Sequence, residues 1–209
     1  MIKGIGAIAA LQLVLASGLA GQTGMTKLFP AQPSGFVTDV AQLLDRPTTE
    51  TIEGRLDHLR TVTGAEVAVV TLPTIGDYDA ADVARTIARA WKGGPDAPIG
   101  DKRRTAGVLI LLVPRTSNHP GEIRIEVGQG VEGAITDARA GQIRDSLLPL
   151  LTQKPSGPAL DEASSIIADI VARDLGVQDS SLWRKQAPAQ HRLRSNGFKT
   201  VIYIVIFIT

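Results

Sequence analysis

The fold of this chain is decided by two neighbouring stretches, AGVLILLV at residues 106–113 and EIRIEV at residues 122–127. The first is an uninterrupted apolar run, which is typical of a strand covered on both faces of a sheet. The second alternates strictly between charged and apolar side chains, and it follows a turn signal at Pro120 and Gly121. That alternation predicts a half-exposed strand that is antiparallel or lies at the edge of the sheet. Together the two stretches predict a hairpin with a buried inner strand.

Helical patterns lie on both sides of this hairpin. Ile52, Leu56 and Leu59 recur at helical spacing between Pro47 and Gly64, which predicts a first helix. The remaining elements are predicted as a strand at 66–72, a helix at about 78–91, and two helices at about 136–151 and 158–175. This order predicts an α/β fold with a small mixed sheet covered by helices on both faces, an αβα sandwich. The crossover that joins the strands at 66–72 and 106–113 is expected to be right-handed.

Composition excludes several classes of protein. The 209 residues are 44% hydrophobic, enough for a buried core, and contain no cysteine, which excludes disulfide scaffolds, cysteine-liganded metal centres and thiol nucleophiles. All 21 acidic residues fall between Asp39 and Asp179, a span that holds 15 of the 22 basic residues and so carries a net charge of −6. Because affinity for nucleic acid comes mostly from clustered Lys and Arg, we expect no nucleic-acid partner for this body.

The N-terminal segment is apolar. Met1, Ile2 and Lys3 precede a run rich in Ala, Leu, Ile and Val that ends at Ala20. The pattern is that of a signal peptide, and as a helix the same run could almost span a bilayer. Residues 1–21 are therefore expected to be either a cleaved signal peptide or an uncleaved membrane anchor. Both alternatives place the body on the periplasmic, non-cytoplasmic side of a membrane.

The C-terminal segment is apolar as well. After a basic linker at 177–200, eight apolar residues are too few to cross a membrane as a helix. We expect this tail, residues 201–209, to be the start of a transmembrane helix, a half-inserted anchor, or a strand added to a partner; an interior strand is the fourth alternative. The expected contact residues are Phe198, Val201, Ile202, Tyr203, Ile204, Val205, Ile206, Phe207 and Ile208. Residues 22–35 are interpreted as a linker and residues 36–176 as the folded domain.

One motif has the form of a dinucleotide fingerprint. Gly128, Gly130 and Gly133 form a G-x-G-x-x-G pattern between a strand and a helix. The preceding strand alternates with charges, and the second strand with an acidic ribose ligand never appears, so the context argues against nucleotide binding. We expect these glycines to form a tight loop with positive φ angles.

The chain also resembles a known family. The matching stretches, in order, are FVTD at 36–39, TGAE at 63–66, Trp91, GVLILLV at 107–113 and RIEVGQGVEGAITD at 124–137. On these stretches, residues 36–172 resemble the TPM domain family, the thylakoid-lumen, photosystem-repair and acetylcholine-receptor-modulator group. The resemblance implies a compact α/β sandwich on the non-cytoplasmic side of a membrane, often beside a transmembrane anchor.

The same resemblance implies candidate metal ligands. Family members are similar in binding a divalent cation, typically calcium, near acidic loop residues, and some are described as acid phosphatases. The matching carboxylates here are Asp39, Asp101, Glu132 and Asp137, and a hard cation needs several such oxygens at once. Ala106-Gly107 departs from the Asn-Gly common in the family. A simpler expectation for Asp39 is a turn, and for Asp137 a helix N-terminus.

A catalytic centre is not predicted. The three histidines, His58, His119 and His191, are far apart, and no G-x-S-x-G motif occurs. We therefore expect no enzyme, but a membrane-tethered accessory, assembly or stabilising subunit of an integral membrane complex, in contact with the lipid bilayer. By family analogy that complex is photosynthetic. The alternative is a calcium-dependent acid phosphatase of the envelope.

Overall fold

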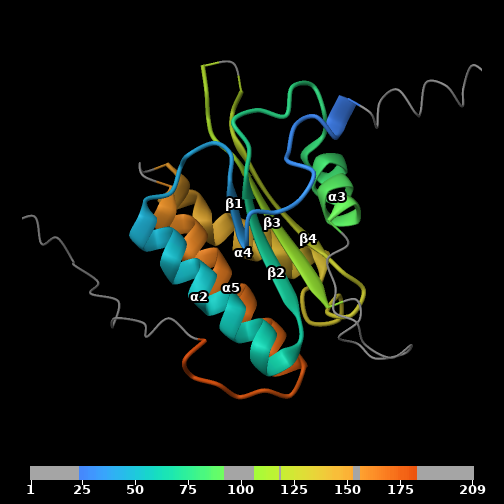
Figure 1. The fold of residues 1–209 in the computed structure, drawn as a ribbon, viewed down its shortest axis with the longest axis vertical. Coiled ribbons are helices and arrows are strands. Elements are labelled where there is room, and N and C mark those ends of the chain that lie inside the picture. The colour runs from blue at the N-terminus through green and yellow to red at the C-terminus, as the bar shows by residue number, and fades with distance from the viewer. Residues whose placement is uncertain (1–23, 92–105, 118, 153–155, 183–209) are drawn as a thin grey trace, which may run out of the picture.

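The computed structural model describes residues 24–91, 106–117, 119–152 and 156–182, drawn in colour in Figure 1. Within them the chain forms four strands and four helices. In chain order these are β1 (Val37–Asp39), α2 (Arg46–Thr63), β2 (Glu66–Thr71), α3 (Ala80–Ala90), β3 (Gly107–Val113), β4 (Glu122–Val127), α4 (Asp137–Leu151) and α5 (Gly157–Asp174). Seven of these elements match the predicted segments closely.

The strands form one mixed sheet in the order β1-β2-β3-β4. β1, β2 and β3 are parallel, and β4 is antiparallel to β3, with Ile110 opposite Ile125. Every residue of β3 after Gly107 is buried, because β3 lies inside the sheet between two helical layers. β4 lies at the edge with alternating exposure. Both features of the hairpin are as the sequence pattern predicted.

β1 is the element that the sequence pattern did not reveal. It has only three residues and pairs with β2 from Val37 opposite Val69 to Asp39 opposite Thr71. The carboxylate of Glu53 on α2 accepts the backbone N–H groups of Phe36 and Val37, at 3.1 and 2.8 Å. This side chain occupies donors at the edge of the sheet that would otherwise be available to another chain.

The presence of β1 also affects the handedness of the connections. The crossovers β1-α2-β2 and β2-α3-β3 step in the same direction across the sheet, but α2 packs on one face and α3 on the other. Two such crossovers necessarily have opposite hands, so the right-handed rule holds for only one of them. The prediction of helices on both faces is confirmed by this arrangement.

The ends of helices α2 and α3 are determined by capping residues. Asp45 caps α2 by accepting the backbone N–H of Thr48, and Asp79 caps α3 in the same manner, which satisfies donors that have no partner inside the helix. Gly64 ends α2 with a φ of 75°, a left-handed conformation that glycine adopts without steric cost. The short connections fix α2 directly beside β2.

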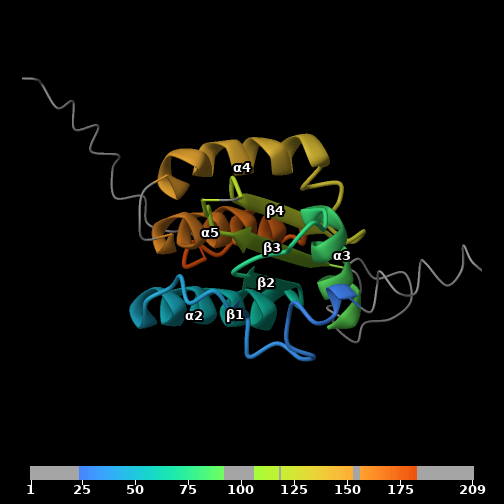
Figure 2. The same ribbon diagram turned by 90° about the horizontal axis from the view of Figure 1, so that it is seen from above.

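The two faces of the sheet carry separate apolar clusters, and Figure 2 shows α3 away from the group formed by α2, α4 and α5. On one face, α2 and α5, with α4 beside β4, cover the side chains of Val67, Val69, Val108 and Ile110. On the other face, α3 covers the strand side chains that alternate with these along β2 and β3. The first face is covered along the length of the strands, and the second only over their carboxyl-terminal half.

The folded unit extends beyond both predicted domain boundaries. Residues 24–35, interpreted from sequence as part of a linker, pack on the α3 face: Phe29 is 7% exposed and meets Trp91 edge to face at 6.0 Å. At the other end, Leu182 is fully buried against the α2 and α5 layer, beyond the predicted end at residue 176. We call residues 24–35 the N-terminal strap. It folds back because Met25, Leu28 and Phe29 bury apolar surface there.

Other sequence-based predictions fall outside the described residues. These are the signal or anchor segment at 1–21, most of the basic linker, and the tail with its contact residues Phe198 and Val201 to Ile208. Among the helices that the structure describes, none combines the length and apolarity needed to cross a membrane.

Candidate functional site

Asp39 lies at the carboxyl end of β1, where its side chain organises a loop. Its carboxylate accepts the backbone N–H groups of Leu43 and Leu44, at 3.0 and 2.9 Å, and the hydroxyl of Thr71. The loop includes Gln42 at a φ of 54°, a conformation uncommon outside glycine. The contacts to Asp39 hold that loop in place, so the turn role expected for this residue is the one the structure shows.

Glu132 and Asp137 lie at the opposite end of the sheet. Both follow β4, which runs antiparallel to its neighbour, and both side chains are exposed. Asp137 is the first residue of α4, whose N-cap is Thr136, so its charge is favourable beside the helix N-terminus. Strands of six residues are about 20 Å long, which separates these two carboxylates from Asp39.

The loop between β4 and α4 contains the three glycines of the G-x-G-x-x-G pattern. It is tight, because the N–H of Val131 bonds to the carbonyl of Gly128 and that of Ile135 to the carbonyl of Val131. The expectation of positive φ angles was wrong: the described glycines with positive φ are Gly64, Gly76, Gly121 and Gly176. The loop is instead made of consecutive turns in ordinary backbone conformations.

The structure therefore does not bring the four predicted ligands together. Asp101 lies outside the described residues. Asp39 lies at the opposite end of the strands from Glu132 and Asp137. Within the described ranges, no group of three or more His, Asp or Glu side chains is placed to hold a metal ion. The carboxylates of this part of the chain do not form the converging oxygen set that calcium needs.

Two histidines have structural roles. The Nε2 of His58 lies 2.7 Å from the carboxylate of Asp179, which ties α2 to the segment after α5. Hydrogen bonds from the hydroxyl and N–H of Ser181, together with the contact to His58, lower the pKa of Asp179 to about 2. His119 accepts the N–H of Gly121 at 3.1 Å in the predicted turn. His191 lies outside the described residues.

A pocket of about 800 Å³ opens on the α3 face, at the amino ends of the parallel strands. Its floor is formed by the first residues of β2 and β3 and the end of β4, and Ala68, Gly107 and Leu109 are among the residues that line it. One wall is the last turn of α3, and the other is residues 33–36 with the end of α2. The volume lies within the range of small-ligand pockets. We call this the strand-start pocket.

Two aromatic side chains border the strand-start pocket. Trp91, at the end of α3, donates its Nε1–H to the carbonyl of Pro30 at 3.0 Å. Phe36 lies on the other wall, where the Arg60 guanidinium lies 5.1 Å from its ring centroid, a cation–π contact. The strap thus fixes one aromatic wall, and α2 fixes the other.

Three glutamates and three arginines line the pocket. Glu53 accepts two backbone N–H groups of the 36–37 segment, Glu126 pairs with Arg124 at 3.1 Å, and Glu66 also has a partner. Among the described residues, Arg60 and Arg85 pair with exposed Asp57 and Asp82 on their own helices, and Arg89 has no ion-pair partner. The rim of the pocket is therefore charged, with both signs present.

Reasoning from the sequence did not identify this pocket. Arg85 and Arg89 are spaced i, i+4 on a strongly amphipathic helix, and a pair of arginines on one helix face could have been noticed. Arg60 comes from another helix, and its position across the pocket depends on β1, which the sequence pattern did not show. No local signal connects the two rims.

Comparisons with known proteins agree with this architecture. The family model of the TPM domain matches residues 37–170. A search of curated proteins gives no match. Among solved structures, the chain is similar to the N-terminal domain of a protein from P. gingivalis, with 29% identity, a TM-score of 0.57, and coverage of 69% of this chain and 86% of that one.

A second solved structure is more distant. It is the N-terminal domain of the cg2496 protein from Corynebacterium glutamicum, with 15% identity, a TM-score of 0.49, and coverage of 65% of this chain and 79% of that one. The family match covers more than half of the sequence, and it includes all four strands and most of the helices. The chain therefore belongs to the TPM domain family.

Proposed function

We propose that this chain is a non-enzymatic accessory subunit whose TPM domain docks on an integral membrane complex on the extracytoplasmic side. The observation that carries this proposal is the strand-start pocket: about 800 Å³ on the thinly covered face of the sheet, with an apolar floor, aromatic walls and a rim of arginines and glutamates. Binding sites combine an apolar lining with a few placed polar groups in this manner.

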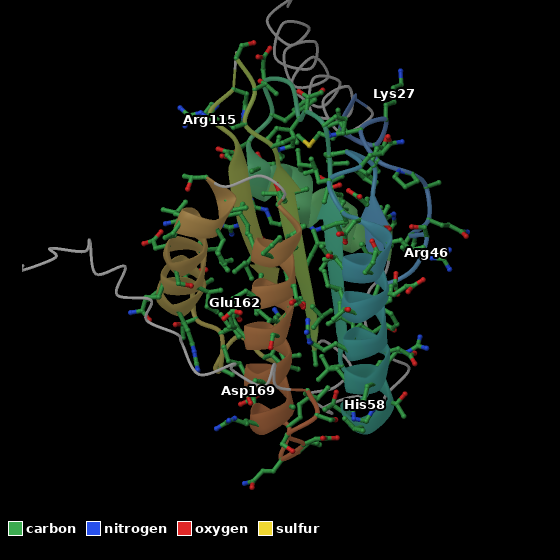
Figure 3. All side chains as sticks on the ribbon, turned by 90° about the vertical axis from the view of Figure 1, so that its left-hand side faces the viewer. Lys27, Arg46, His58, Arg115, Glu162 and Asp169 are labelled. Carbon is green, nitrogen blue, oxygen red and sulfur yellow. The ribbon has the colours of Figure 1, made fainter. Side chains whose placement is uncertain are left out.

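The two ends of the described chain lie at opposite ends of the domain. In Figure 1 the N-terminal strap, drawn in blue, lies near α3, whereas the orange segment after α5 lies at the other end. Figure 3 shows the same separation through Lys27 and His58, which lie at opposite ends. The apolar segments of the sequence that support a membrane-held arrangement lie beyond these two ends.

A pull-down of the full chain in mild detergent tests the proposal. We expect the protein to co-purify with membrane proteins, and deletion of residues 198–209 to release it while the melting temperature of the domain stays unchanged. Intact-mass measurement of the native protein would show whether residues 1–21 are retained. Recovery of a solitary monomer at every detergent concentration would refute the accessory-subunit role.

A calcium-dependent acid phosphatase is the alternative, favoured by the name of the matching family model, TPM phosphatase. Phosphomonoester turnover, measured with and without Ca²⁺, separates the two functions. Asp137→Ala is the informative variant, with Asp145→Ala on the same helix as a matched control. Turnover that needs Ca²⁺ and disappears only in Asp137→Ala would replace the accessory role.

A further inference from the structure

We infer that the N-terminal strap controls the strand-start pocket through Trp91, so that the wall of the pocket is complete only while the strap is docked on α3. Control of this kind would regulate the docking face, and as regulation it rests on the proposed function. Three features of the structure support it: a side chain shared by strap and pocket, the continuity of the strap with the second pocket wall, and the way in which the strap is held.

The first feature is that Trp91 belongs both to the pocket and to the strap contact. It lines the pocket, its Nε1–H donates to the carbonyl of Pro30 at 3.0 Å, and its ring meets Phe29 edge to face with the centroids 6.0 Å apart. The backbone of Trp91 is held separately, because its N–H bonds to the carbonyl of Ile87 at 2.9 Å as the C-cap of α3. The strap contacts therefore decide where the indole lies, and the helix decides where its backbone lies.

The second feature is that the strap continues directly into the opposite wall of the pocket. Pro30 lies close in sequence to residues 33–36, which line the pocket. This second part of the strap leads into the sheet, where the carboxylate of Glu53 accepts the backbone N–H groups of residues 36 and 37. One short segment thus holds one wall of the pocket in place and forms part of the other.

The third feature is that the first part of the strap is held by its side chains. Its backbone hydrogen bonds from Lys27 to Gly24 and from Leu28 to Met25 are internal to it. Met25, Leu28 and Phe29 pack on the apolar cluster of the α3 face. A segment held by a few apolar contacts opens locally at a lower free energy than the core. The first part of the strap is therefore able to detach while residues 33–36 stay on the sheet.

Detachment changes the pocket, because Trp91 then loses both partners that hold its indole. A molecule bound against the docked indole favours the docked strap, and by linkage the docked strap favours binding of that molecule by the same factor. In sequence, the strap directly follows the apolar N-terminal segment. The strap therefore connects that segment to the docking face.

The experiment uses the absence of cysteine from the chain. Ala68→Cys places a single thiol on the pocket floor, and Ala140→Cys places one on α4, against the other face of the sheet; both alanines are partly buried. Mass spectrometry measures the rate of alkylation by N-ethylmaleimide in the full chain in detergent micelles. We expect Phe29→Ala to raise the rate at Ala68→Cys by about fivefold or more, because the strap and the indole no longer shield the floor. The rate at Ala140→Cys should stay within about twofold.

A matched control and a second measurement separate this effect from unfolding. Lys27→Ala, a surface change in the strap, should leave both alkylation rates unchanged. With Trp183→Phe, the tryptophan emission comes from Trp91, and acrylamide should quench it more strongly in Phe29→Ala. Phe29→Leu, which loses the ring contact but stays apolar, replaces Phe29→Ala if a melting curve shows that the latter is unfolded.

Three results would overturn the inference: an unchanged or lower rate at Ala68→Cys in Phe29→Ala, an equal rise at Ala140→Cys, or an equal rise in Lys27→Ala. Unchanged quenching of Trp91 would also overturn it. If the rates do not respond while the chain still co-purifies with membrane proteins, only this inference fails. If they respond but the native protein is solitary, the proposed function fails.

Discussion

The face of the sheet covered by α2, α4 and α5 and the face covered by α3 are packed in different ways. On the first, side chains such as Leu56, Ile110 and Ile167 are completely buried, and the cluster continues from one end of the strands to the other. On the second, the cluster ends near Leu109, and the amino ends of the strands open into a pocket. The two faces share the same strands, so the difference comes from the helices and the strap.

Polar groups differ between the faces as well. The three-helix face holds an ion pair between Arg55 of α2 and Asp161 of α5, at 2.7 Å, with the two side chains 9% and 15% exposed. Arg55 also donates to the hydroxyl of Ser164 at 2.6 Å. The charges of the α3 face are exposed or line the pocket. We infer that the first face provides most of the stability, and that the second is free to bind a partner. Four predictions test this division.

The largest effect is expected at the buried ion pair. Asp161→Ala leaves Arg55 buried and without its carboxylate, which should lower the free energy of unfolding by about 3–5 kcal/mol. Replacing both, as Arg55→Met/Asp161→Leu, should return it to within about 1 kcal/mol of the parent because no buried charge remains. Urea denaturation of the two variants measures both values. A double variant as unstable as the single one would show that the pair itself is required.

Substitution of two neighbouring residues of β3 compares how much each face contributes to the free energy of unfolding. Ile110 points into the three-helix face and Leu109 toward the pocket. We expect Ile110→Ala to cost about 3–5 kcal/mol, because a closed cavity forms. Leu109, which is 5% exposed beside the pocket, should cost about 2–3 kcal/mol when replaced by Ala, the low end of the usual range, because solvent can enter the space from the pocket. Equal losses in urea denaturation would contradict the proposed division between the faces.

The strap is expected to contribute less. Phe29→Ala removes the edge-to-face contact with Trp91 and part of the cover over α3, and should cost about 1–3 kcal/mol. Limited proteolysis should then cut residues 24–35 before any other described segment. Lys27→Ala, a surface change in the same segment, is the control. An unchanged cleavage rate in Phe29→Ala would show that the strap is held by other contacts.

The smallest effect concerns pH. Because the pKa of Asp179 is lowered to about 2, its contribution to stability is fully present above the unfolded pKa near 4 and is lost as pH falls toward 2. Ser181→Ala removes the leading cause, so the pKa of Asp179 should rise. A carboxyl NMR titration between pH 2 and 5 measures the shift. A titration midpoint identical in Ser181→Ala would contradict this assignment of the cause.

The sequence alone determined most of the elements and their order. The periodicity of the long helices, the unbroken apolar run of β3 and the alternation of β4 follow directly from which faces are buried. Local chemistry also fixed the turn at Asp39 and the position of Asp137 at a helix N-terminus. These predictions succeed because they depend on residues within a few positions of one another. The resemblance to the TPM domain family has the same local basis, in the stretch from Arg124 to Asp137.

The tertiary structure decided what depends on distant contacts. β1 is three residues long, too short for a periodic pattern, and it is a strand only because β2 and Glu53 supply its hydrogen bonds. The strap has the composition of a linker, yet Phe29 is buried because α3 and Trp91 leave an apolar surface for it. The strand-start pocket is lined by Arg60 from one helix and by Arg85 and Arg89 from another. Its existence depends on the packing of separate helices, which no short stretch of sequence encodes.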